Sequence, residues 1–138
     1  MKSNLEVIMQ RTLLAVILVL SSSQALAAQN HTFPEPSYRI LPREAGAILP
    51  PFLEGGAIRA AGDTLIWQIK ETVALASFRM VGDTLQLVEI PNGNQHCGPV
   101  TGAYRLRFAA DTITPELVTD ECEGRRMGMT QMRLLPNR

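Results

Sequence analysis

The chain has 138 residues, of which 13 are basic and 13 are acidic, so its formal net charge at pH 7 is zero. Nucleic-acid-binding proteins bind the phosphate backbone through clustered Lys and Arg side chains. This chain is neutral and has no such basic stripe, so we expect no nucleic-acid partner. The length suits a single folded domain.

The first 27 residues have the pattern of a secretion signal. Basic residues precede an apolar run over 13–20, and a polar stretch leads to small residues ending at Ala27. Eight apolar residues are too few for a spanning helix, which takes about 20, whereas the small residues predict cleavage after Ala27. An uncleaved membrane anchor is the alternative. We expect a periplasmic or secreted chain that begins at Ala28 and keeps no stable membrane anchor.

The mature chain, 28–138, divides by composition into two parts. Residues 28–56 contain five prolines and no sustained periodicity, which predicts a proline-rich extended arm. From 57 onward, short apolar stretches alternate with turn residues, and we expect the single β-barrel domain to cover 57–138.

A repeated string marks the turns of this domain. Gly-Asp-Thr-Leu occupies 62–65 and 82–85, and Ala-Asp-Thr-Ile at 110–113 is a weaker copy. Glycine accepts positive φ and aspartate bonds its own downstream backbone, so Gly-Asp is typical of a turn between strands. Three similar corners predict an antiparallel meander.

Alternation of apolar and polar residues places the strands. The segment 72–78 would also suit a short helix, and Pro115 indicates a strand edge or a bulge. Short strands with little convincing helix predict an all-β fold, a small antiparallel meander closing into a barrel. The predicted strands are 57–61, 64–70, 73–81, 84–90, 103–109, 112–119 and 127–135.

The two cysteines, Cys97 and Cys122, flank one predicted hairpin. Export to an oxidising compartment favours a disulfide between them, whereas a redox-active pair would need closer spacing or an activated thiolate. In the chain-entropy model, closing this 25-residue separation stabilises the fold by about 3 to 4 kcal/mol. We expect a structural bridge.

From Gly82 to Arg125 the chain carries a recognisable order of motifs: the turn at 82–85, Cys97, Gly102-Ala103-Tyr104, the turn at 111–113, then Asp120-x-Cys122-x-x-Arg125. In this order it resembles small secreted lipocalin-like (calycin-type) bacterial proteins, most of which are uncharacterised. The resemblance implies a small β-barrel, which in such proteins often has an apolar interior with room for a ligand. Within the motif, Gly102 and Tyr104 open a strand. Asp120 is expected to bond loop amides, and Arg125 to be a paired, solvated group at a barrel end rather than a ligand contact.

The expected function is binding, with a small apolar molecule or an envelope component as the partner. A protein-interaction module, such as an inhibitor of a secreted enzyme or an envelope assembly factor, is the alternative. The candidate interior residues are Trp67, Ile69, Phe78, Leu85, Leu87, Tyr104, Leu106, Phe108 and the late methionines, Met127, Met129 and Met132.

Catalysis is not expected, because the two histidines, His31 and His96, adjoin no nucleophile motif, and no phosphate loop, zinc spacing or dinucleotide fingerprint occurs. The acidic residues near Glu116 are explained as a surface loop rather than as a glycosidase pair. We expect no cofactor and no metal. Two metal sites are the alternatives. If cleavage falls after Ala28, the new N-terminus with His31 in third place would chelate Cu(II) or Ni(II); His96 with Met127, Met129 and Met132 would suit Cu(I).

Overall fold

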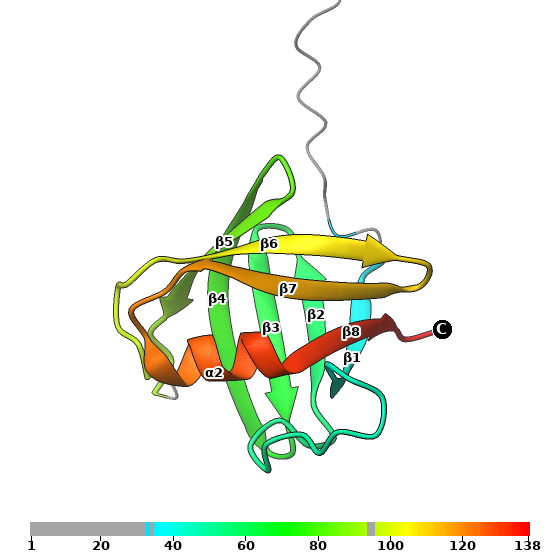
Figure 1. Cartoon of the computed structure of the whole chain (residues 1–138). Helices are drawn as coiled ribbons and strands as arrows, with labels where there is room; N and C mark the ends of the chain where they lie inside the picture. Colours follow the sequence, from blue (N-terminus) through cyan, green and yellow to red (C-terminus); the bar gives the residue numbers. More distant parts are fainter. Residues whose placement is uncertain (1–32, 34, 94–95) are drawn as a thin grey trace, which may run out of the picture.

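The computed structural model describes residues 33, 35–93 and 96–138 (Figure 1). The predicted signal peptide and the first residues of the predicted arm lie outside these residues. No helix in the described part of the chain is long and apolar enough to cross a membrane.

The described chain is nearly all β-structure, and each strand pairs antiparallel with the next in sequence. β1 also pairs with β8, which closes the barrel and confirms the predicted meander. The strands are β1 (Ser37–Pro42), β2 (Ala57–Ala61), β3 (Thr64–Ile69), β4 (Thr72–Val81), β5 (Thr84–Ile90), β6 (Gly102–Ala109), β7 (Thr112–Thr119) and β8 (Met132–Pro136). The six strands predicted between 57 and 119 are confirmed, and 72–78 belongs to a strand rather than a helix.

The extent of the proline-rich arm was predicted wrongly. Residues 37–42 form β1, which pairs with both β2 and β8, so the barrel begins at Ser37 and not at Ala57. Tyr38 and Ile40 are buried on the inner face of this strand. The flanking prolines conceal the alternation, because the strand is only six residues long.

The predicted strand 127–135 is wrong in its first half. Residues Glu123–Gln131 form helix α2, and β8 starts only at Met132. Two glycines make this a poor helix sequence, yet Arg125, Gly128 and Met129 are its buried residues, at the three- and four-residue spacing of a helix face. Figure 1 shows α2 running directly into β8 along one side of the barrel.

Pro115 lies in β7 beside the seam with β8, where only the pair Ile113↔Leu134 is in register. The missing N–H of Pro115 therefore removes no backbone hydrogen bond between β7 and β8. The register shift in this hairpin lies at Ala103/Tyr104 instead. Across the seam, Arg43 Nη1 donates to the Pro115 carbonyl at 2.7 Å.

The barrel interior is filled by side chains. Most of the core comes from the inward positions of the strands, with Leu53 from the β1–β2 loop and Met129 from α2 closing one end. The fully buried members with the largest side chains are Tyr38, Ile58, Leu65, Leu85, Leu87, Tyr104, Met129 and Met132. Any space for a ligand must therefore lie at an end of the barrel.

Four two-residue turns connect consecutive strands, and each begins with a residue at positive φ. Glycine occupies this position in the repeated turns, at Gly62 (φ 61°) and Gly82 (φ 62°), whereas Lys70 (φ 56°) and Ala110 (φ 51°) hold it in the others. An L-residue with a Cβ is strained in this region by about 1 to 2 kcal/mol. The weaker copy at 110–113 is thus the same turn without its glycine.

Replacing Ala110 with glycine should raise the free energy of unfolding by up to about 1 kcal/mol, because strain is removed at a modest entropic cost. Urea unfolding monitored by Trp67 fluorescence measures this change. Ala109→Gly, one residue earlier and inside β6, is the matched control and should destabilise the barrel. Equal destabilisation by both variants would contradict the turn assignment.

Candidate functional site

Asp120 and Arg125 form a buried, two-pronged ion pair at one end of the barrel. Arg125 Nε donates to Asp120 Oδ2 at 2.6 Å and Nη2 donates to Oδ1 at 2.8 Å, and the side chains are 3% (Arg125) and 0% (Asp120) exposed. Asp120 follows β7 and Arg125 lies on the first turn of α2. The predicted pairing is confirmed, but the expected solvation is wrong, since Leu53 and α2 cover this end of the barrel.

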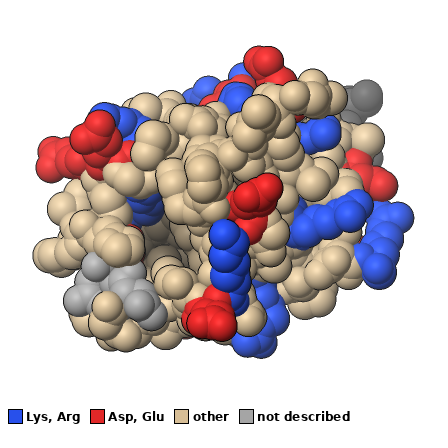
Figure 2. Space-filling view, turned by 90° about the horizontal axis from the view of Figure 1, so that it is seen from below, with Lys and Arg blue, Asp and Glu red and all other residues tan. Residues whose placement is uncertain are grey.

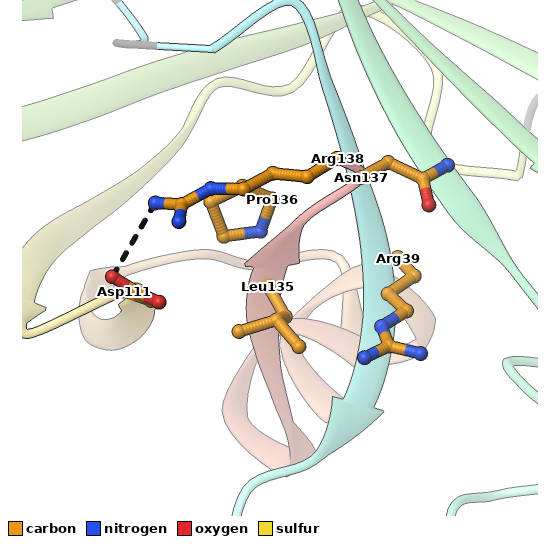
Figure 3. A pocket seen from close by; sticks show the side chains of 6 residues that line it. All are labelled: Arg39, Asp111, Leu135, Pro136, Asn137 and Arg138. Atoms are coloured by element: carbon orange, nitrogen blue, oxygen red, sulfur yellow. Dashed lines mark hydrogen bonds and ion pairs between the residues drawn. The ribbon is translucent and has the colours of Figure 1, made fainter.

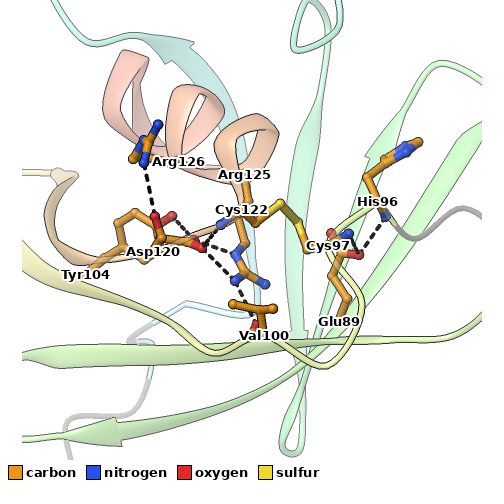
Figure 4. Close-up of a disulfide and its surroundings, with 9 residues drawn as sticks. All are labelled: Glu89, His96, Cys97, Val100, Tyr104, Asp120, Cys122, Arg125 and Arg126. Atoms are coloured by element: carbon orange, nitrogen blue, oxygen red, sulfur yellow. Dashed lines mark hydrogen bonds and ion pairs between the residues drawn. A yellow bond between two sulfur atoms is a disulfide. The ribbon is translucent and has the colours of Figure 1, made fainter.

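Three further groups complete the pair (Figure 4). The Tyr104 hydroxyl donates to Asp120 Oδ2, and the Cys122 amide donates to Oδ1 at 2.9 Å. Arg125 Nη2 also donates to the Val100 carbonyl at 2.8 Å. The predicted bond between Asp120 and a loop amide is thus confirmed. With four donors, the carboxylate is saturated, as a buried charge requires.

Gly102 leaves the space that this pair fills. A Cβ built at Gly102 would overlap Asp120 Oδ2 and would lie 2.9 Å from Arg125 Nε. The separate motifs Gly102-x-Tyr104 and Asp120-x-Cys122-x-x-Arg125 are therefore parts of one packed cluster. The cluster therefore has a structural role, because it joins the β6–β7 hairpin to α2.

The charges of the cluster are set by burial and by these hydrogen bonds. Burial raises the pKa of Asp120, but the bonds from Arg125, Tyr104 and Cys122 outweigh it and bring the pKa below its ordinary value. Burial, and then the bond to Asp120, raise the pKa of the Tyr104 phenol. At neutral pH the site therefore holds an anionic Asp120, a cationic Arg125 and a neutral, donating Tyr104.

The predicted disulfide between Cys97 and Cys122 is present. It ties the loop before β6 to the segment after β7, so it closes the hairpin that carries Tyr104. The Glu89 carboxylate at the end of β5 accepts the His96 and Cys97 amides at 2.7 and 2.8 Å. This fixes the loop on which Cys97 lies.

A cavity of about 540 Å³ opens beside the cluster, at the end of the barrel covered by α2. Its wall comes from six segments: loop residues 51–53, β3 with the turn that follows it, the start of β4, Glu89 of β5, the 96–97 loop, and α2 with Arg125 and Met127. Figure 2, viewed from below the orientation of Figure 1, shows this end of the molecule hollowed. Cavities of this size take small organic ligands.

Two buried donors of residues that line this cavity have no hydrogen-bond partner in the described part of the chain. They are Trp67 Nε1 and Arg125 Nη1, and both residues line the cavity. In Figure 4 one terminal nitrogen of Arg125 carries no dashed line, in contrast to the other two guanidinium nitrogens. A buried donor without a partner costs free energy, so each such group in a folded chain needs an explanation.

The predicted interior residues divide into three groups. Leu85, Leu87, Tyr104 and Leu106 are fully buried in the core, and Phe78 packs against it. Trp67 and Ile69 also pack against the core but line the cavity. Phe108 is wrong as an interior residue, because it is 49% exposed near the end of β6, and Met127 among the late methionines is exposed as well.

The sequence did not identify the rest of the cavity wall. Phe52 and Leu53 lie in the predicted arm, Gly124 lies in the predicted loop after Cys122, and Gly128 lies in the predicted strand 127–135. The spacing of Arg125, Gly128 and Met129 was the available signal for a helix here. No signal in the sequence linked residues 51–53 to this site.

A second hollow of about 300 Å³ lies at β8 and the carboxyl-terminal residues (Figure 3). It contains Arg39 and an ion pair between Arg138 Nη2 and Asp111 Oδ1 at 3.5 Å, whose side chains are largely exposed. Exposed pairs of this kind contribute little and are screened by salt. Elsewhere in the described chain, no group of three or more His, Cys, Asp or Glu side chains is placed to hold a metal ion.

Gly102→Ala should lower the free energy of unfolding by about 3 to 5 kcal/mol, the loss expected when a buried ion pair is broken. Chemical denaturation of the oxidised protein measures it. Gly124→Ala is the matched control: a Cβ there meets nothing within 4 Å, and helix propensity rises by up to about 1 kcal/mol. A mild effect at Gly102 would show that the pair tolerates displacement.

The pH dependence of stability should report the lowered pKa of Asp120. A group with a lowered folded pKa stabilises fully above its unfolded pKa, about 3.9, and loses this contribution as the pH falls through the folded value. Tyr104→Phe removes a bond to the charged carboxylate, so its destabilisation should be largest at neutral pH and shrink below about pH 4.

Denaturant titrations from pH 7 to pH 2 measure this difference. Tyr38→Phe serves as the control, because the Tyr38 hydroxyl accepts only the Glu35 amide. Its stability curve should run parallel to that of the wild type. If the stability curve of Tyr104→Phe also ran parallel to that of the wild type, the proposed bond between Tyr104 and an ionised Asp120 would be contradicted.

Comparison with known proteins gives no significant match: no family model, no curated protein and no solved structure is similar to this chain. The resemblance of residues 82–125 to lipocalin-like proteins therefore stays a prediction. The cavity and its two unpartnered donors carry the functional inference.

Proposed function

We propose that this chain is an exported, disulfide-stabilised β-barrel that binds a small apolar molecule in the cavity beneath α2. The observation that carries the proposal is the cavity of about 540 Å³, whose wall is formed mainly by apolar side chains such as Ile69, Leu53 and Met127. Burial of an apolar molecule against such a wall is favourable by about 25 cal/mol per Å² removed from water.

The architecture around the cavity supports binding without large rearrangement. The disulfide, the Asp120–Arg125 pair and the carboxylate of Glu89 hold three of the wall segments in place. A wall held in this way loses little conformational entropy when a ligand enters. Export is part of the proposal, and the signal-like pattern of residues 1–27 together with the disulfide supports it.

A protein-interaction role is the second candidate, because the β1–β2 loop exposes apolar side chains. Ile48 is 94% exposed, and Phe52 is 46% exposed at the mouth of the cavity. An envelope protein or a secreted enzyme would cover such residues. This candidate predicts a protein partner rather than a small molecule in the purified complex.

Replacing a small residue of the cavity wall by a large one fills the cavity and tests the proposal. Ala74 lines it, and Ala74→Phe should abolish binding of the neutral apolar dye Nile red, measured by fluorescence titration. Native mass spectrometry of protein taken from the periplasm should likewise show a small-molecule adduct on the wild type and none on this variant.

Leu75→Phe is the matched control. Successive side chains of a strand point to opposite faces, so residue 75 lies on the outside of β4 and its substitution should leave dye binding unchanged. Wild-type protein that carries only its own mass and binds no dye would refute the proposal. A co-purifying protein whose binding is lost in Ile48→Ser would favour the second candidate.

A further inference from the structure

We propose that the ligand of the cavity is an apolar molecule with a neutral carbonyl-type oxygen, which accepts hydrogen bonds from Arg125 Nη1 and Trp67 Nε1. This inference rests on the proposed function and narrows it to a ligand class. It starts from the two buried donors without partners on the wall of one cavity. Each buried donor without a partner is costly in the free protein and is stabilised when an acceptor is present.

Arg125 supplies the first donor. Its Nε and Nη2 are used by Asp120 and Val100, which fixes the plane of the guanidinium. Nη1 is the remaining nitrogen, and the residue is 6% exposed, so no bulk solvent satisfies it. A guanidinium held by three other hydrogen bonds presents its free N–H groups in a defined direction.

Trp67 supplies the second donor from another element. It lies in β3, two residues before Ile69 on the same strand face, and packs against the core. Indole nitrogen is a donor only, and buried indoles usually find a partner. Because the described residues offer these two donors no acceptor, we expect the acceptor atom to come from a bound ligand.

The charges near Arg125 favour a neutral acceptor over an anion. Asp120 already neutralises the guanidinium from the other side, and the carboxylate of Glu89 lies on the wall of the same cavity. A ligand carboxylate would add a negative charge to a cavity that already contains Glu89 and whose one buried cation is paired with Asp120. The remaining cation of the wall, Lys70, is exposed and screened.

The oxygen-bearing end of the ligand is therefore expected beside Arg125 and Trp67. Its apolar body would lie against Ile69, Leu53 and Met127, which line the same cavity. Ketones, esters and amides with an apolar group share this chemistry. A carboxylate is charged, and a hydrocarbon has no acceptor oxygen, so neither combines an apolar group with a neutral carbonyl oxygen.

Three probes with equal numbers of non-hydrogen atoms separate these classes: 4-phenylbutan-2-one, pentylbenzene and 3-phenylpropanoate. Their affinities for the oxidised wild-type protein are measured by displacement of Nile red at pH 7.5. For the two neutral probes, the association constant is divided by the water-to-hexadecane partition coefficient of the probe. This removes the difference in their hydrophobicity. The ketone should then exceed the hydrocarbon about tenfold or more, since hydrogen bonds to charged donors are the stronger class.

Trp67→Phe tests the site on the protein side. It removes one donor and keeps an aromatic ring in the wall, so the fold is retained. The ketone affinity should fall about five- to tenfold, while pentylbenzene binding changes by no more than about twofold. The substitution leaves the Asp120–Arg125 pair untouched, because Trp67 bonds to neither residue.

The outcomes separate this inference from the proposed function. If the hydrocarbon and the ketone bind in proportion to their partition coefficients, the cavity binds apolar molecules but the acceptor assignment is wrong. Tighter binding of 3-phenylpropanoate than of the ketone would also overturn it, in favour of an anionic ligand. If none of the probes displaces the dye and none binds directly, both the proposed function and this inference fail.

Discussion

The buried ion pair of Asp120 and Arg125 is the interaction on which the rest of this end of the molecule depends. Two charges removed from water cost least when every lone pair and proton finds a partner. Asp120 meets this condition with four donors, one of them the Tyr104 hydroxyl. Arg125 does not, because Nη1 is left over. The pair thus fixes the fold and leaves one donor unused beside a cavity.

The geometry of the pair explains why distant parts of the chain are arranged together. Gly102 must lack a side chain, Asp120 must leave β7 next to it, and α2 must begin within reach of the carboxylate. The Cys97–Cys122 bridge holds the same two chain segments from the other side. Helix α2 is short and contains two glycines, so its place depends on this cluster more than on its own propensity. The cavity exists because α2 is held there.

The sequence predicted those features that depend on local order. The repeated turns and the alternation on either side placed six strands and the closed meander, and the cysteine pair was assigned correctly. The sequence did not predict β1, because prolines flank that short strand. It did not predict α2 either, because the spacing of its apolar residues fits a strand as well as a helix. The burial of Asp120 and the cavity wall depend on contacts such as that between Leu53 and α2. Such contacts join residues more than 70 positions apart and leave no local signal.

The seam between β7 and β8 has a consequence of its own. Only Ile113 and Leu134 are in register there, and Arg43 bridges the gap through the carbonyls of Pro115 and Thr130. Separation of strands at this seam breaks the fewest backbone hydrogen bonds anywhere around the described barrel. Because α2 connects β7 to β8, the barrel is closed at this seam by side-chain bonds more than by its backbone ladder.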